Sequence, residues 1–306
     1  MSLKEQFELL DKEGLKGFNE AVKESRGLDK IIWDILQRSL GVRTLIKYLT
    51  DVTSDPENKD VHTIAQDFLH LLGVEINSEE LPAWMSETGK PVLFYSNHDV
   101  KIEPIILTAL FEREDFAFLG LANNMATKLQ DIFRDHIIPV MPRKYAVDSP
   151  RTVSFVERLL MTNHEVTLAE AAEINDRSLQ ESAQRLLEGE AVGIFPAGSR
   201  SEQDEWFPGI GKIITEVKDL KEKNPTINES KDILLAPINF SGFSGLQLLK
   251  ALRSTYSKYR FPTQKQVDIQ FGKPLSLNEM TELGNDSKRL TSLLQSHYLT
   301  QFLLND

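Results

Sequence analysis

The sequence predicts an α/β protein in which a mixed sheet is flanked by helices, with a small N-terminal helical bundle before it. From about residue 90 onward, short apolar runs rich in β-formers alternate with stretches whose apolar residues recur at helical spacing. Before about residue 80, only the helical spacing is found. The chain has 306 residues, which suits one large domain with an appendage, and we expect a helical domain at 1–80 and an α/β domain at 81–306.

The N-terminal segment carries apolar residues at helical spacing in two stretches, at 28–36 and 61–72. A loop cluster, Thr53-Ser-Asp-Pro-Glu-Asn, separates the two stretches. We therefore expect three or four helices there and no strand before residue 80.

Strands and helices alternate in the rest of the chain. The expected strands cover 91–95, 116–119, 137–140, 191–195, 233–240 and 267–271. The expected helices begin at Pro104 and Ser149, cover 176–188 with Gly189 as the stop, and close the chain at 285–304. Polar segments fall at or after three strand ends, at 96–103, 139–144 and 196–201. Because ligands of open α/β sheets bind beyond the carboxyl ends of strands, these segments predict a site.

Composition and charge exclude several classes of protein. The chain is 41% hydrophobic and 26% charged, as globular proteins are, and no run of 18 apolar residues predicts a membrane span. Lys and Arg number 35 and Asp and Glu 46, and the net charge of −11 disfavours nucleic-acid binding. The absence of cysteine excludes a disulfide scaffold, a thiolate zinc site and a cysteine nucleophile. The N-terminal sequence resembles no targeting signal, so we expect a cytoplasmic protein, or an organellar one whose transit peptide has been removed.

The first polar segment places His98 at a strand end and Glu103 near the start of the next helix. A strand–turn–helix path can return Glu103 to one imidazole nitrogen, which fixes the tautomer and leaves the other nitrogen to act as a general base. Asp99 is an alternative partner, although adjacent side chains rarely meet in this way. A second alternative is a polar loop histidine followed by a carboxylate that the helix dipole favours. No Ser, Cys or Lys pairs obviously with His98, so direct proton abstraction is favoured over covalent catalysis.

The third polar segment, Gly193-Ile-Phe-Pro-Ala-Gly-Ser-Arg-Ser, runs from a buried strand into a turn. Gly198 allows backbone N–H groups to approach a ligand closely, and the forked cation of Arg200 suits phosphate or carboxylate. The alternative is a tight turn with a surface arginine.

Together these segments resemble the glycerolipid acyltransferase family. Four blocks stand in the family's order, namely Asn97-His98-x4-Glu103, Ile138-Pro-Val-Met-Pro-Arg143, Phe195-Pro-Ala-Gly-Ser-Arg200 and Leu235-Ala-Pro237-Ile. The resemblance covers about residues 90–275, and four ordered blocks are far more specific than one. The chain is most similar to the soluble plastid-type glycerol-3-phosphate acyltransferases. These also have a helical N-terminal domain, lack the usual Glu in the third block, and follow that block with a stretch like Glu205-Trp-Phe-Pro208.

The resemblance implies a metal-independent acyltransferase of phospholipid biosynthesis without a cofactor, whose catalytic domain is 81–306. The acyl donor would be a thioester of acyl carrier protein or coenzyme A. His98 would take the proton of a glycerol 3-phosphate hydroxyl, and Glu103 would orient His98. The acceptor phosphate would be bound by Arg143, Lys144, Arg200 and Ser201. The turn and the oxyanion contacts would come from Asn97, Gly198 and Ser199. The compartment would be the cytoplasm or the plastid stroma.

Three positions depart from the family's pattern. Glu103 replaces an Asp, Ala197 lacks the side chain that most relatives use, and Glu202 stands where the plastid type has a second Arg. Lys101 or Lys212 could replace that second cation. The acceptor therefore stays open between glycerol 3-phosphate, lysophosphatidate and another molecule. A non-catalytic lipid or acyl-carrier binding protein and a metal-dependent phosphoesterase are further alternatives.

A basic stretch extends from 233 to 267 and contains no Asp or Glu, so that it carries +5 while the other residues carry −16. It predicts either a solvated helix face or a docking surface. The surface would receive the acyl donor, as acyl carrier protein or the coenzyme A phosphates, or anionic lipid headgroups in a peripheral membrane contact. The expected donor-docking residues are Lys250, Arg253, Lys258 and Arg260.

Overall fold

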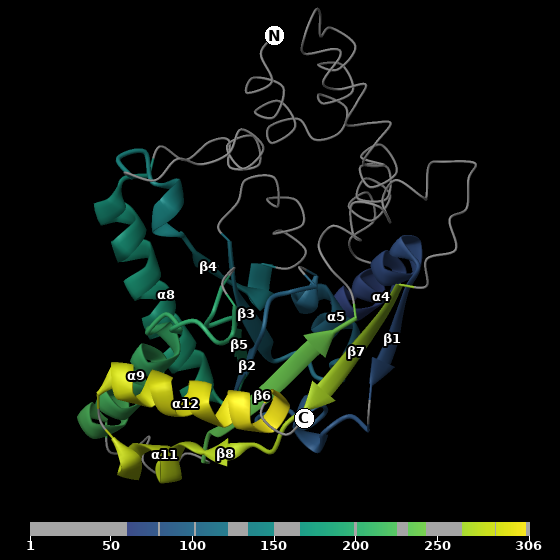
Figure 1. Cartoon of the computed structure of the whole chain (residues 1–306). Helices are drawn as coiled ribbons and strands as arrows, with labels where there is room; N and C mark the ends of the chain where they lie inside the picture. The colour runs from purple at the N-terminus through teal and green to yellow at the C-terminus, as the bar shows by residue number, and fades with distance from the viewer. Residues whose placement is uncertain are drawn as a thin grey trace, which may run out of the picture.

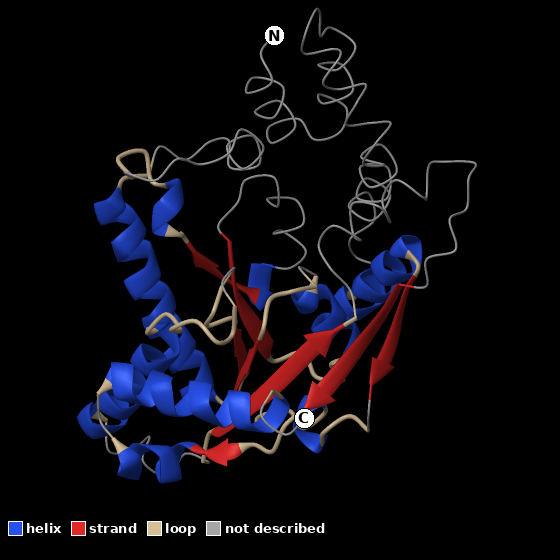
Figure 2. Ribbon diagram, viewed as in Figure 1, coloured by secondary structure: helices blue, strands red, loops and turns tan. Residues whose placement is uncertain are grey.

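The computed structural model describes residues 60–78, 80–100, 102–121, 134–149, 166–198, 201–224, 232–242, 265–284 and 286–303. Within them the chain forms one mixed eight-stranded sheet with helices on both faces, which confirms the predicted fold class (Figures 1 and 2). The strands are β1 (Val74–Ser78), β2 (Val92–Ser96), β3 (Phe116–Leu121), β4 (Ile137–Val140), β5 (Ala191–Ile194), β6 (Leu234–Ser241), β7 (Lys265–Phe271) and β8 (Leu275–Ser276). The described α-helices are α4 (Val61–Leu72), α5 (Glu103–Leu110), α8 (Leu168–Glu188), α9 (Gly209–Lys223), α11 (Leu277–Leu283) and α12 (Ser287–Phe302).

The order of the strands brings the carboxyl ends of β2 and β5 together. The order is β1-β7-β6-β2-β5-β3-β4, with β8 beside β6. The five strands β2 to β6 run parallel to one another, whereas β7 runs antiparallel to β6. In register, Tyr95 at the end of β2 lies beside Ile194 of β5 on one side and Pro237 of β6 on the other. The residues that follow β2 and β5 are therefore neighbours at one edge of the sheet.

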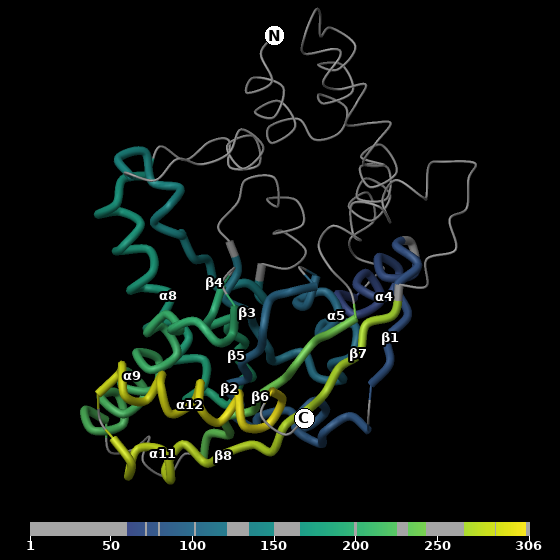
Figure 3. The backbone as a smooth tube through the Cα atoms, in the orientation of Figure 1, coloured from purple at the N-terminus to yellow at the C-terminus, as the bar shows by residue number. Residues whose placement is uncertain are grey.

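The alternation of side chains along the strands builds two cores. Val92 and Phe94 of β2 point to the face that α4 and α5 cover, and Leu93 and Tyr95 point to the opposite face, toward α8, α9 and α12. The trace in Figure 3 shows α12 lying along α9 on that second face, consistent with their close packing. Gly193 in β5 lets the Phe94 ring cross the strand, because a Cβ added there would lie 2.2 Å from the ring.

The ends of α8 show how local sequence sets a helix. Thr167 and Glu170 form a capping box at its start, and Gly189 ends it in the left-handed conformation, with φ of 98°. The predicted stop at Gly189 is therefore confirmed. The predicted start at residue 176 is eight residues late, because the capping box was not recognised in the sequence.

The expectation of no strand before residue 80 is wrong. Val74–Ser78 forms β1 at the edge of the sheet and pairs in parallel with β7. Only the predicted helix at 61–72 falls within the described part of the N-terminal segment, where it is α4. The rest of the predicted bundle and most of the helix expected from Ser149 lie outside the described residues, so the division into 1–80 and 81–306 stays a prediction.

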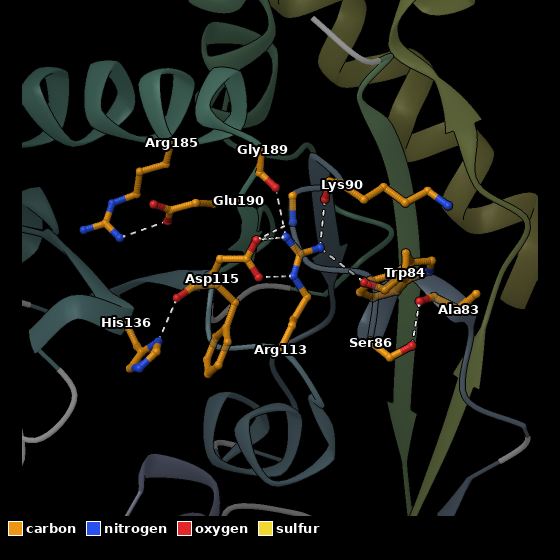
Figure 4. A network of polar contacts seen from close by, with 12 residues as sticks. Ala83, Trp84, Ser86, Lys90, Arg113, Asp115, His136, Arg185, Gly189 and Glu190 are labelled. Atoms are coloured by element: carbon orange, nitrogen blue, oxygen red, sulfur yellow. Dashed lines mark hydrogen bonds and ion pairs between the residues drawn. The ribbon is translucent and has the colours of Figure 1, made fainter.

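A buried arginine joins the amino ends of three parallel strands (Figure 4). The guanidinium of Arg113 is fully buried, and Nε and Nη2 bind both carboxylate oxygens of Asp115 at 2.6 Å. Its remaining N–H groups donate to the backbone carbonyls of Trp84, Lys90 and Gly189. All five guanidinium donors thus have acceptors, which offsets the cost of burying the charge. Because these residues precede β2, β3 and β5, the network lies at the opposite edge of the sheet from the predicted site.

The charge of Asp115 is stabilised by this network. Burial raises the pKa of its carboxyl, but the hydrogen bonds from Arg113 and from the backbone N–H of Gly89 together outweigh burial, so the pKa lies below its ordinary value. No helix among the described residues is long and apolar enough to cross a bilayer.

Candidate active site

His98 and Glu103 are in direct contact at the carboxyl end of β2. The Nδ1 atom of His98 lies 2.9 Å from Glu103 Oε2, and the second carboxylate oxygen accepts the backbone N–H of Val100 at 2.7 Å. The Glu103 side chain is fully buried, whereas 29% of the His98 side chain is exposed. A buried carboxylate held from two sides fixes the orientation of the imidazole. It also favours the tautomer that carries its proton on Nδ1, which gives Nε2 the lone pair.

The local sequence explains why Glu103 lies at this place. Glu103 is the first residue of α5, and Pro104 occupies the first turn, where the absence of its N–H costs nothing. The turn after β2 thus returns the carboxylate to the strand end, as the strand–turn–helix prediction expected. Asp99, the alternative partner, instead accepts a hydrogen bond from the Asn97 amide at 3.2 Å.

Asn97 fixes the strand end from which His98 extends. Its buried side chain donates to the carbonyl of Phe240 at 2.7 Å and accepts the Phe240 N–H at 2.8 Å, which imitates one more rung of the β2–β6 pairing. The predicted contact between Asn97 and an oxyanion stays a prediction.

The third polar segment meets the first at this edge. The ring of Phe195, directly after β5, lies against the His98 ring with 4.7 Å between centroids. The chain then turns through Pro196 and Ala197, and the Gly198 N–H donates to the Phe195 carbonyl at 3.0 Å. Gly198 has φ of 62°, a left-handed conformation that favours glycine. Its N–H closes the turn, so it contacts an oxyanion only if the turn opens.

Two of the predicted residues in this segment, Ser199 and Arg200, lie outside the described residues. Ser201 is exposed, and both its groups serve a local turn: its N–H donates to Asp204, and its hydroxyl accepts from the Gln203 N–H. The small side chain of Ala197 fits its surroundings, because Ala197 is 1% exposed and packs in the second core. A longer acidic side chain there would have to be accommodated in that core.

Arg143 and Lys144 follow β4 in a short 3-10 helix (Arg143–Tyr145). Arg143 is exposed, and the Lys144 ammonium lies 4.7 Å from the centroid of the Tyr145 ring. Three strand spacings separate β4 from β2, so the strand ends lie about 14 Å apart at ~4.8 Å per strand. Arg143 is therefore on the same edge as His98 but is not in contact with it in any described interaction.

Asn175 of α8 holds the connection that carries these cations. Its amide accepts the Met141 N–H and donates to the Met141 carbonyl, both at 2.8 Å. The hydroxyl of Ser178 on the next turn donates to the Pro139 carbonyl. Neither residue was predicted from the sequence, because a polar residue within a helix gives no indication of a backbone partner 34 or 39 positions away.

Of the remaining predicted cations, only Lys212 lies within the described residues. Lys212 pairs with Asp176 of α8 at 3.6 Å, and its role as a replacement for the second arginine stays a prediction. Lys101 and the whole donor-docking set, Lys250, Arg253, Lys258 and Arg260, lie outside the described residues. Glu202 itself acts on Tyr298 electrostatically and raises its pKa further, after the larger effect of burial. Among the described residues, no group of three or more His, Asp or Glu side chains could bind a metal ion.

Comparison with known proteins gives only a distant likeness. No family model and no curated protein matches the chain. Among solved structures, it is similar to the crystal structure of the 1-acyl-sn-glycerophosphate (LPA) acyltransferase, PlsC, from Thermotoga maritima. The identity is 13%, the alignment covers 97% of this chain and 94% of that chain, and the TM-score is 0.41. At this distance the likeness assigns neither family nor activity to the chain, so its function has to be inferred from its own residues.

Proposed function

We propose that the chain is an acyltransferase that moves an acyl group from a thioester to a hydroxyl of glycerol 3-phosphate. One observation carries the proposal: a partly exposed histidine at a strand end is oriented by a fully buried carboxylate, His98 by Glu103. The described residues of the four sequence blocks that resemble glycerolipid acyltransferases fall at this edge of the sheet or on the strands that form it. The enzyme would act without a metal, in the synthesis of phospholipids.

In the proposed reaction, Nε2 of His98 takes the proton of the acceptor hydroxyl. The alkoxide attacks the thioester carbonyl, and a tetrahedral intermediate forms. The C–S bond then breaks, and the thiolate leaves with the proton returned by the imidazolium. Glu103 stabilises that imidazolium throughout, because its charge lies 2.9 Å from Nδ1. No covalent acyl-enzyme is required.

The acceptor phosphate would be bound by Arg143, Lys144 and Arg200, with Ser201 beside them. The exposure of Arg143 and its place on the same edge as His98 support this assignment. Replacing Arg200 by Ala should mainly raise the KM for the acceptor, because a phosphate contact remote from the reacting bond contributes to uniform binding.

Glu202 favours a different candidate acceptor, either lysophosphatidate or another hydroxyl compound. Its carboxylate stands where the plastid-type enzymes carry a second phosphate-binding arginine, and it lies close enough to Tyr298 to act on its pKa. A panel of acceptors with a single acyl donor would separate the two candidates. Ligand binding without any thioester release would instead support a non-catalytic lipid or acyl-carrier binding protein.

The donor would be a thioester of acyl carrier protein or coenzyme A, received by the basic stretch at 233–267. Reversing the charges of Arg253 and Lys258 should raise the KM for the donor, and more strongly at low salt. The test is thioester release in the presence of glycerol 3-phosphate, with both donors compared. Unchanged donor kinetics in the charge-reversed variant would show that the stretch is only a solvated surface.

A further inference from the structure

The imidazole of His98 is held at one atom and lies against a second ring. Glu103 Oε2 lies 2.9 Å from Nδ1, and a hydrogen bond there fixes that atom, but it does not by itself stop the ring from swinging about the bond. The ring of Phe195 lies against the imidazole, with 4.7 Å between centroids and 36° between planes. This arrangement is nearer to stacked than to edge-on, so Phe195 restricts the swing on its side.

The backbone at Phe195 is fixed by the strand before it and by the turn after it. β5 lies beside β2 in parallel, so Phe195, directly after β5, emerges beside the strand end that carries His98. The Phe195 carbonyl accepts the Gly198 N–H at 3.0 Å, and the next carbonyl, of Pro196, accepts the Phe207 N–H at 3.0 Å. With the backbone bonded in this way, the Phe195 ring has only a few staggered positions to choose from.

The packing of the fold does not explain the place of this ring. Within the described part of the chain, Phe195 belongs to neither of the two cores, and its side chain is half-buried. Phe94 of β2 and Phe118 of β3 are instead buried in the first core. A large apolar side chain that stays partly in water gives up part of the free energy of burial, so the position of Phe195 calls for another reason.

An aromatic ring at this position suits a base that becomes charged during the reaction. When Nε2 of His98 takes a proton, the imidazole becomes an imidazolium cation. A cation within about 6 Å of an aromatic centroid is attracted by the π face, and the two rings are well within that distance, at 4.7 Å. The Glu103 carboxylate attracts the same charge at the Nδ1 edge. Phe195 thus stabilises the imidazolium without adding an acceptor that competes for the proton on Nε2.

We propose that Phe195 is a positioning residue for the general base: its ring holds the imidazole of His98 and stabilises the imidazolium formed by proton transfer. The effect on turnover rests on the proposed function. The effect on the His98 ring does not, and it can be measured without any substrate.

The test uses Phe195→Leu and Phe195→Tyr, with Phe271→Leu as the matched control. Phe271 is also half-buried and also stands at a strand end, but its ring packs against Trp84 at 6.3 Å. We expect Phe195→Leu to lower kcat about 10-fold with both KM values unchanged, since a cation–π contact is lost and the base is less well aligned. Phe195→Tyr keeps the ring face, so it and Phe271→Leu should keep the wild-type kcat. A wild-type kcat in Phe195→Leu would overturn the inference, and so would an equal fall in either of the other two variants.

The second readout is NMR of the histidine rings. The chain has six histidines, and the signals of His98 are assigned with His98→Gln. Phe195→Leu should displace the His98 ring signals, because a neighbouring aromatic ring shifts them, and it should lower the order parameter of the Cε1–Hε1 bond. Phe195→Tyr and Phe271→Leu should leave that order parameter unchanged. Unmoved His98 signals in Phe195→Leu contradict the proposed contact, and a displaced ring with wild-type kcat contradicts its role in turnover.

Failure to fold and failure of the proposed function are both distinguished from failure of this inference. If Phe195→Leu does not fold, as judged by circular dichroism, Phe195→Met replaces it, because Met keeps a long apolar side chain without a ring. If the wild-type protein releases no thioester with any acceptor, the proposed function fails, and the NMR comparison still decides whether Phe195 holds the His98 ring.

Discussion

Replacing Glu103 by Gln tests how the candidate base is oriented. The amide oxygen of Gln can still accept the Val100 N–H, as Oε1 does now at 2.7 Å. The amide nitrogen then faces His98 in place of Oε2, and it is a donor, so it cannot accept the proton on Nδ1. The ring responds by adopting the other tautomer, in which Nδ1 accepts and Nε2 carries the proton. In that form Nε2 no longer acts as a base.

The loss should approach the whole contribution of general-base catalysis, which is about 10²–10⁴-fold in kcat. At ~1.36 kcal/mol per factor of ten, this corresponds to about 3–5 kcal/mol of the activation free energy. The assay is steady-state thioester release at saturating acceptor, with Asp99→Asn as the control. Asp99 is exposed, and its side chain accepts a hydrogen bond from Asn97, so its variant should stay within about two-fold of wild type. A Glu103→Gln variant that keeps more than a tenth of the wild-type kcat would refute this role.

Three further predictions concern stability and the acceptor site. Arg113→Met should lower the free energy of unfolding by about 3–5 kcal/mol in urea titrations, because Asp115 is left without its partner; the surface variant Arg177→Met should change it by less than ~0.5 kcal/mol. The pKa of Asp115 lies below its ordinary 3.8, so its charge stabilises the fold above pH 3.8 and this contribution is lost as the pH falls through the lowered pKa. Urea titrations from pH 6 to pH 2.5 should therefore show a steeper loss of stability for wild type than for Asp115→Asn, and equal slopes would contradict this. Asn175→Ala should raise the KM for the acceptor about 10-fold with kcat unchanged, because Asn175 holds the backbone before the predicted phosphate-binding cations. Gln184→Ala, on the exposed face of the same helix, should change neither constant. A fall in kcat alone would count against a role of Asn175 in the phosphate site.

The parts of the site that sequence predicted correctly are local. His98 and Glu103 are five residues apart, and a strand–turn–helix path alone brings their side chains together. The strands β2 to β7 were predicted from apolar runs because each is buried on at least one face, and β2 is buried along its whole length. Their shared edge follows from parallel strands, which align their carboxyl ends.

The parts that sequence missed depend on partners far along the chain. Arg113 binds the carbonyl of Gly189, 76 residues away, and no pattern near Arg113 indicates that acceptor. Tyr298 lies in the closing helix that was predicted at 285–304, but the partner of its hydroxyl, Asn239, lies 59 residues before it. The edge strand β1 was missed for another reason, because an edge strand with two exposed and two half-buried residues of five carries a weak apolar pattern.

The central claim is that His98 removes the proton of the acceptor hydroxyl. Its most direct test is thioester release by wild type and His98→Ala, with and without glycerol 3-phosphate, together with calorimetric binding of the acceptor to both proteins. We predict release that depends on the acceptor in wild type, a fall of at least about 10²-fold in His98→Ala, and acceptor binding that is nearly unchanged. Equal release by wild type and His98→Ala would contradict the claim.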